Sequence, residues 1–127
     1  MSCTAEHNVA PREKAPASDF LVVFATAATH EQAENIAQLL VTERLAACVT
    51  VVPEVRSCYR WQDQICKDQE SLLIIKTRAA LFARLSDKIR QVHSYEVPEI
   101  LALPVTDGAP SYLQWLLDAT RRDDDRG

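Results

Sequence analysis

Residues 55–77, VRSCYRWQDQICKDQESLLIIKT, have the pattern of a single β-hairpin. In the first arm, successive side chains alternate between two faces, and Tyr59 and Trp61 share one of them, as in a strand. Polar residues at 62–64 mark the turn, and the returning arm ends in the apolar run 72–75, which suits a strand covered on both faces. Each arm has about ten residues or more, whereas strands usually have about five or six.

The outer half of this hairpin, around Trp61, would extend past any core that the remaining chain supplies. A two-stranded ribbon on its own is only marginally stable in water, and its open edge can pair with another chain. We therefore predict that the hairpin forms an oligomer contact.

Composition limits the class of protein. The chain has 127 residues, of which 47% are apolar and 25% charged, as expected for one soluble globular domain. The net charge of −4 argues against a nucleic-acid partner, because phosphates select a basic surface. No apolar run approaches the roughly 20 residues that span a bilayer, and no apolar signal segment opens the sequence. We expect a cytoplasmic protein with reduced cysteines and no membrane partner.

Motifs for catalysis are missing from the sequence. Two glycines in the whole chain exclude a glycine-rich phosphate loop. No Ser/His/Asp set and no paired-carboxylate motif can be traced along the sequence. We therefore predict that the protein is not an enzyme.

The order of the predicted elements defines the fold. Strands are predicted at 20–26, at 48–52 continuing into the hairpin, and at 100–105, and helices from Thr29 to about Ala46, from Leu81 to Val92 and at 111–119. Thr29 is a good N-cap with Gln32 three residues on, and Pro53 predicts a bulge or an edge position. This β-α-β-β-α-β order predicts an α+β ferredoxin-like sandwich with a C-terminal helix and a long hairpin between its second and third strands.

The helices of this fold cover one face of the sheet only. Because the apolar run 72–75 faces both sides, other subunits are expected to cover the second face, in a closed dimer or trimer. We predict one domain at 19–120, between a disordered arm at 1–18 and a flexible tail at 121–127.

Three linked groups of residues resemble the CutA family of divalent-cation tolerance proteins. They are ERLAACV at 43–49, YRWQ at 59–62 followed by Glu70 and Lys76-Thr77, and VPEILALPV at 97–105 followed by YLQWL at 112–116. The resemblance spans about residues 20–120. It implies a ferredoxin-like fold, a homotrimer similar to PII signalling proteins with hairpins that reach across to neighbouring subunits, and a role in tolerance of divalent metals, copper above all.

The copper ligands proposed for this family are a cysteine at the end of the first strand and two adjacent histidines after the second long helix. By position they fall on Ala25, Val92 and His93. Only His93 offers a donor atom, and tight copper binding needs several nitrogen or sulfur donors. The resemblance thus implies His93 as a ligand for copper or another divalent cation, while the simpler interpretation is a histidine that ends a helix.

A second set of residues is predicted to meet at a cleft between subunits. Its members are Tyr59, Trp61, Glu70, Lys76, Tyr95, Glu99 and Trp115. They either pack and pair at a trimer interface, or line a cleft that binds a small anionic or metal-chelated ligand, with Lys76 as its charge. Two functions therefore stay open: a metal-tolerance trimer, and a PII-like regulatory or scaffolding trimer that binds a small ligand or a protein partner.

Overall fold

The computed structural model describes residues 19–122, so the arm predicted at 1–18 and the tail beyond residue 122 lie outside the described residues. Its elements are β1 (Phe20–Ala27), α2 (His30–Thr42), β2 (Cys48–Trp61), β3 (Gln64–Arg78), a 3₁₀ turn η3 (Ala79–Leu81), α3 (Phe82–Val92), β4 (Ile100–Pro104) and α4 (Pro110–Ala119). None of the helices in this range combines the length and the apolar character needed to cross a membrane.

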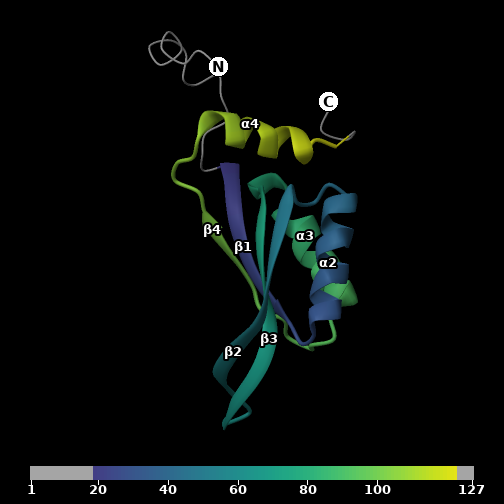
Figure 1. Cartoon of the computed structure of the whole chain (residues 1–127), viewed down its shortest axis with the longest axis vertical. Helices are drawn as coiled ribbons and strands as arrows, with labels where there is room; N and C mark the ends of the chain where they lie inside the picture. Colours follow the sequence, from purple (N-terminus) through teal and green to yellow (C-terminus); the bar gives the residue numbers. More distant parts are fainter. Residues whose placement is uncertain (1–18, 123–127) are drawn as a thin grey trace.

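The four strands form one antiparallel sheet in the order β2-β3-β1-β4. Helices α2 and α3 lie together against one face of it, and α4 lies across one end, opposite the tip of the β2-β3 hairpin (Figure 1). The predicted ferredoxin-like fold, with its long hairpin and C-terminal helix, is confirmed.

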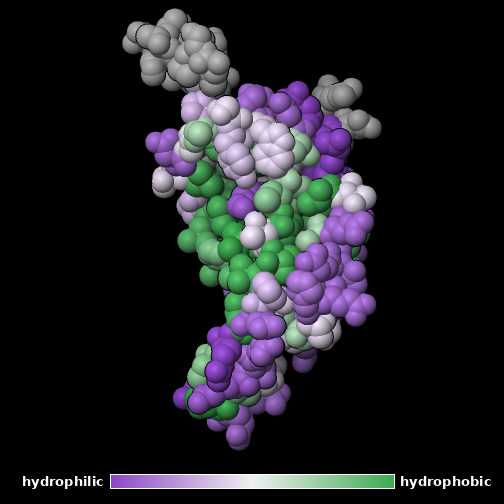
Figure 2. All heavy atoms as spheres, in the orientation of Figure 1, coloured by the Kyte–Doolittle hydropathy of each residue, from purple (hydrophilic) through white to green (hydrophobic). Residues whose placement is uncertain are grey.

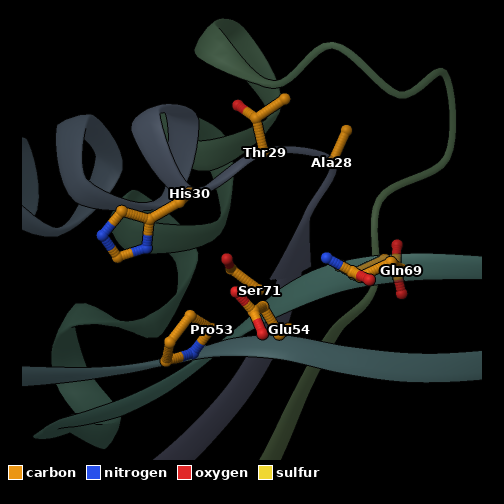
Figure 3. Close-up of a pocket in the computed structure, with 8 residues that line it drawn as sticks. Ala28, Thr29, His30, Pro53, Glu54, Gln69 and Ser71 are labelled. Atoms are coloured by element: carbon orange, nitrogen blue, oxygen red, sulfur yellow. The ribbon is translucent and has the colours of Figure 1, made fainter.

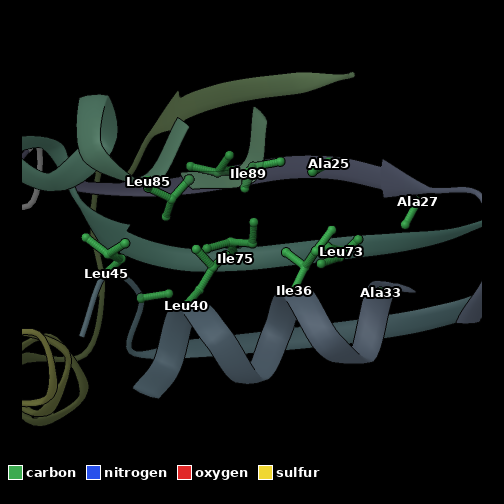
Figure 4. Packing of buried hydrophobic residues seen from close by; sticks show 12 residues of the cluster. Ala25, Ala27, Ala33, Ile36, Leu40, Leu45, Leu73, Ile75, Leu85 and Ile89 are labelled. Carbon is green, nitrogen blue, oxygen red and sulfur yellow. The ribbon is translucent and has the colours of Figure 1, made fainter. Parts of the chain in front are cut away.

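The core lies between the sheet and helices α2 and α3 (Figure 4). Alternate residues of the central strands point into it, which follows from the two-residue period of a strand. On the helices, the buried positions recur at spacings of three and four residues. The larger buried side chains of this core are Val23, Ile36, Leu40, Leu45, Leu73, Ile75, Leu85 and Ile89.

Helix α2 ends at Thr42, so the prediction that it continues to Ala46 is wrong. Arg44 adopts a left-handed conformation, with φ of 58°, which turns the chain back. The amides of Leu45 and Ala46 then both donate to the carbonyl of Leu40, at 2.9 and 3.2 Å. Both side chains stay buried, which explains why they continue the apolar spacing of a helix that has already ended.

Two apolar side chains on the helices are exposed. Val92, the last residue of α3, is 44% exposed at the edge of a groove beside α2. Tyr112 of α4 is also exposed, because this helix buries Leu116 against Phe20 while Tyr112 turns outward and packs on Trp115 with ring centroids 5.4 Å apart.

The C-terminal end of α4 is held by arginines from distant parts of the chain. Arg44 Nη1 donates to the carbonyl of Ala119 at 3.1 Å. Arg78 Nε donates to Thr120 Oγ1 at 2.9 Å, and Arg78 Nη2 to the Thr120 carbonyl at 2.8 Å. Cationic side chains suit the partial negative charge at this end of a helix.

The hairpin has the turn and the bulge that the sequence predicts. Strand pairing continues to Trp61 opposite Gln64, and Gln62 and Asp63 form the two-residue turn with φ of 51° and 63°. Positive φ at both central residues is typical of a type I′ turn, whose twist matches that of the strands. The register shifts between Val52 and Val55 on β2, which is an edge strand, so the bulge and the edge position that were predicted as alternatives at Pro53 are both found.

The sheet face opposite the two long helices is largely open. Figure 2 shows apolar side chains gathered on the surface between α4 and the ribbon. Strand register assigns Val22, Phe24, Leu72, Ile74, Leu101 and Leu103 to this face. Leu101 and Leu103 on the edge strand are 60% and 43% exposed. Exposed apolar side chains that gather into a contiguous surface are unusual on a monomeric protein.

The turn after α2 provides a test of the fold. Thr77 is fully buried, and its hydroxyl donates to the carbonyl of Leu45 at 2.6 Å. We expect Thr77→Val to lower the free energy of unfolding by about 1–3 kcal/mol, because the shape is kept while a buried carbonyl loses its donor. Denaturant unfolding at one fixed protein concentration measures this, with Thr106→Val at an exposed loop position as the control. Equal losses in both variants would contradict the assignment.

Candidate functional site

His93 follows the last residue of α3, and both of its ring nitrogens are engaged. Nε2 lies 2.6 Å from the carbonyl oxygen of Thr26, and Nδ1 lies 3.0 Å from the backbone nitrogen of Tyr95. A carbonyl accepts and an amide donates, so Nε2 carries the proton and Nδ1 uses its lone pair. The ring is therefore a neutral imidazole that ties the end of β1 to the loop after α3.

This arrangement leaves His93 poorly prepared to bind a metal within one chain. A metal-binding histidine often donates its second ring N–H to a carbonyl, as Nε2 does here. The lone pair of Nδ1, however, already accepts the hydrogen bond from the Tyr95 amide. A copper ion could bind there only by displacing that amide.

The other two positions implied for copper supply no donor. Ala25 is buried and faces the helices, and Val92 is an exposed valine. Across residues 19–122, no three His, Cys, Asp or Glu side chains are grouped closely enough to hold a metal ion. The described residues of a single chain therefore do not fit a copper site.

Tyr95 and Glu70, two members of the predicted cleft set, are in contact. Tyr95 Oη donates to Glu70 Oε2 at 2.6 Å, and Glu70 is only 7% exposed. Burial raises the pKa of Tyr95 well above its usual range, and the hydrogen bond to Glu70 and the charge of that carboxylate add to the rise. At neutral pH the phenol thus stays protonated and connects the loop after α3 to the base of the hairpin ribbon.

A second tyrosine–carboxylate pair lies further along the same face of the ribbon. Tyr59 Oη donates to Asp68 Oδ2. This hydrogen bond is the largest cause that raises the pKa of Tyr59 to about 12, with desolvation and the charge of Asp68 acting in the same direction. Both phenols are therefore hydrogen-bond donors at neutral pH, and neither is suited to act as a base.

Lys76 lies at the other end of β3. Its Nζ donates to Thr50 Oγ1 at 3.3 Å and to Cys48 Sγ at 3.8 Å, both on β2. Six residues separate Lys76 from Glu70 along one strand, a distance of about 20 Å at the usual strand rise. Trp115 belongs to this same end, because α4 packs near the C-terminal end of β3.

The predicted cleft set is thus divided within one chain. Glu70, Tyr95, Tyr59 and Trp61 lie toward the hairpin, whereas Lys76 and Trp115 lie toward α4. Trp61 is exposed near the tip of the ribbon. Glu99 is exposed just before β4 and makes no hydrogen bond or ion pair with residues 19–122. Whether a second subunit joins the two groups stays a prediction.

Sequence reasoning missed two hydrogen-bond partners in the site, Asp68 and the carbonyl of Thr26. The turn places Tyr59 opposite Cys66 and Cys58 opposite Lys67, so the two thiols point to opposite sides of the ribbon. The same register puts Asp68 two residues from Cys66, on the face of Tyr59, and this signal could have identified the Tyr59–Asp68 pair. No pattern in the sequence points to the Thr26 carbonyl, because backbone groups carry no residue signature.

Comparisons with known proteins agree with this fold. The family described as CutA1 divalent ion tolerance protein matches residues 21–119. The divalent-cation tolerance protein CutA of Thermus thermophilus is 48% identical over 99 residues, which are 78% of this chain and 96% of that protein. The chloroplastic CutA of Arabidopsis thaliana is 44% identical over 101 residues, which are 80% of this chain but only 56% of that protein.

Solved structures give the same result. The Thermus thermophilus CutA1 structure is similar with a TM-score of 0.79 and 46% identity, covering 80% of this chain and 99% of that one. CutA from Xylella fastidiosa gives a TM-score of 0.80 at 40% identity, covering 82% of this chain and 100% of that one. The fold, the matched range and these identities together show that the chain belongs to the CutA1 family of divalent ion tolerance proteins.

Proposed function

We propose that the chain acts as a cytoplasmic homotrimer in tolerance of, or response to, divalent cations, with copper as the principal cation. Membership of the divalent ion tolerance family supports the general role. The observation that carries the assembly is the open apolar face of the sheet, which continues onto a ribbon with no other cover from residues 19–122. We also propose that this role is not catalytic, because the two tyrosines of the site are donors locked onto carboxylates.

Burial of the open face supports closed assembly. Side chains such as Leu101 and Leu103 gain roughly 25 cal/mol for each Å² of apolar surface removed from water. A closed ring of three copies would cover this face on every subunit and leave no edge strand unpaired. Trp61 near the end of the ribbon is the residue best placed to reach a neighbouring subunit.

Weak or indirect copper binding involving His93 is the finer part of the proposal. His93 is the only implied ligand position that has a donor atom, and a threefold axis can bring three copies of one residue together. Binding through Nδ1 must first break the hydrogen bond from Tyr95. We therefore expect an affinity for copper well below that of a site whose ligand atoms accept no hydrogen bond beforehand.

The alternative is a PII-like regulatory or scaffolding trimer that binds a small ligand or a protein partner between subunits. Its support is the division of the candidate residues into a group near Glu70 and a group near Lys76. In a cyclic assembly, one end of a sheet can face the other end of its neighbour, which would bring the carboxylate–tyrosine group and the lysine together. A cleft of this kind offers charges of both signs and aromatic walls.

Truncation of Trp61 tests the assembly. Native mass spectrometry of the wild-type protein should give a trimer. Trp61→Ala should weaken each intersubunit contact by roughly tenfold or more, because a large aromatic anchor is lost, while each subunit stays folded. Val41→Ala, which changes a similarly exposed residue on the helix side, is the matched control and should leave the trimer intact. A wild-type monomer under the same mild conditions would count against the proposal.

Copper uptake tests the metal role in the same instrument. We expect whole numbers of copper ions on each wild-type trimer and their loss in His93→Ala. His30→Ala removes an exposed histidine that pairs with Glu34 at 3.3 Å, so it controls for adventitious surface binding. A trimer that takes up no copper would contradict copper binding and favour the ligand-binding alternative. Equal uptake in His93→Ala and wild type would rule out His93.

A further inference from the structure

A cavity of about 460 Å³ lies where α2 begins and β2 bulges away from β3. Its polar lining comes from Thr29 and His30 at the helix, Glu54 on the bulge, and Gln69 and Ser71 on β3. Figure 3 shows Thr29 and His30 on one side of this space and Glu54 and Ser71 on the other. Ser71 belongs to the helix-facing side of the sheet, opposite the open face discussed above.

Ser71 is the first observation that points to a ligand. The residue is only 2% exposed, and its hydroxyl makes no hydrogen bond with any of residues 19–122. The hydroxyl points into the space between the start of α2 and the ribbon (Figure 3). The Ser71 hydroxyl is not one of the fully buried side-chain atoms that lack a partner, so solvent in this space reaches it. A bound molecule that accepts a hydrogen bond can take the place of that solvent.

The N-terminus of α2 is the second observation. Thr29 Oγ1 accepts from the Gln32 amide at 3.1 Å, and the Thr29 carbonyl accepts from the Ala33 amide at 3.1 Å. The amides of His30 and Glu31 precede these and have no acceptor inside the helix. In a helix of 13 residues, such amides and the positive end of the dipole favour a carboxylate.

Glu54 supplies the opposite polarity. Its carboxylate forms no ion pair or hydrogen bond with any residue from 19 to 122, and it lines the same cavity. The negative charge of Glu54 repels a multiply charged anion such as phosphate, and the positive end of the helix dipole repels a metal cation. A ligand that carries a positive and a negative group a few bonds apart satisfies both.

From this arrangement we infer that the cavity binds a small zwitterion of the α-amino-acid class. The ligand carboxylate accepts from the amides of His30 and Glu31 and from the Ser71 hydroxyl, and its ammonium group pairs with Glu54. Gln69 and the methyl group of Ala28 border the ligand side chain. The inference is independent of the proposed metal role, and its failure would leave that role untouched.

The test compares three probes on the full-length wild-type protein. L-Alanine has both charges, N-acetyl-L-alanine lacks the positive one and L-alaninamide lacks the negative one. Titrations followed by amide NMR should show L-alanine at millimolar concentration shifting the signals of His30, Glu31 and Ser71. Each blocked probe should bind at least about tenfold more weakly than L-alanine, since it loses one charge-assisted contact.

Two variants test the residues. Glu54→Gln should weaken L-alanine binding by about fivefold or more, and Ser71→Ala by a smaller factor. Glu96→Gln, the same change at an exposed carboxylate outside the cavity, should bind like the wild type. Because Glu54 is exposed, Glu54→Gln keeps its fold and decides the question even if Ser71→Ala unfolds.

Several results would overturn the inference. If N-acetyl-L-alanine binds as tightly as L-alanine, the cavity is an anion site only, and if L-alaninamide does so, it is a cation site only. Absence of any shift at millimolar L-alanine, or unchanged binding in Glu54→Gln, would also refute it.

Discussion

Strand β3 is covered by helices on only one of its two apolar faces, and most of the molecule follows from this constraint. Helices α2 and α3 lie on the same side of the sheet, which is what right-handed crossover connections require in this strand order. Leu73 and Ile75 therefore enter the core, whereas Leu72 and Ile74 point to the open side. The same strand continues into the ribbon, and thus connects the core to the surface that is proposed to meet other subunits.

The hydrogen bonds of His93 show how a residue that matches a proposed metal-ligand position of the family can have a structural role instead. The imidazole holds the Thr26 carbonyl and the Tyr95 amide, and Tyr95 in turn holds Glu70. One histidine thus connects the end of β1, the loop after α3 and the base of the ribbon. This structural role is enough to account for a histidine at that position whether or not a metal binds.

The fold could be predicted from the sequence because its signals are local. Alternation along residues 55–77, the Thr29 cap, Pro53 and the polar turn each depend on neighbouring residues only. The end of α2 could not, since Arg44 takes a left-handed conformation for which glycine or asparagine is the usual signal. The buried Leu45 and Ala46 continue the apolar spacing of the helix into the turn, so the sequence predicts a helix that is four residues too long.

The candidate site was predicted less well, for a related reason. The register of the hairpin follows from its turn, so the cross-strand neighbours of Tyr59 could be predicted from the sequence. The contact between Tyr95 and Glu70 depends on the path of the loop after α3, which no periodicity describes. The separation of Lys76 from Glu70 follows from strand rise, and both residues still share one strand face.

The arginines around the end of α4 affect how this protein can be shortened or joined to others. Arg78 donates twice to Thr120, and Arg44 donates to Ala119, so the last turn of α4 is bound to the ends of β3 and α2. A domain boundary drawn at the last regular helical residue would delete both acceptors of the Arg78 hydrogen bonds. For a fusion protein or a minimal scaffold, the shortest natural unit therefore extends through Thr120.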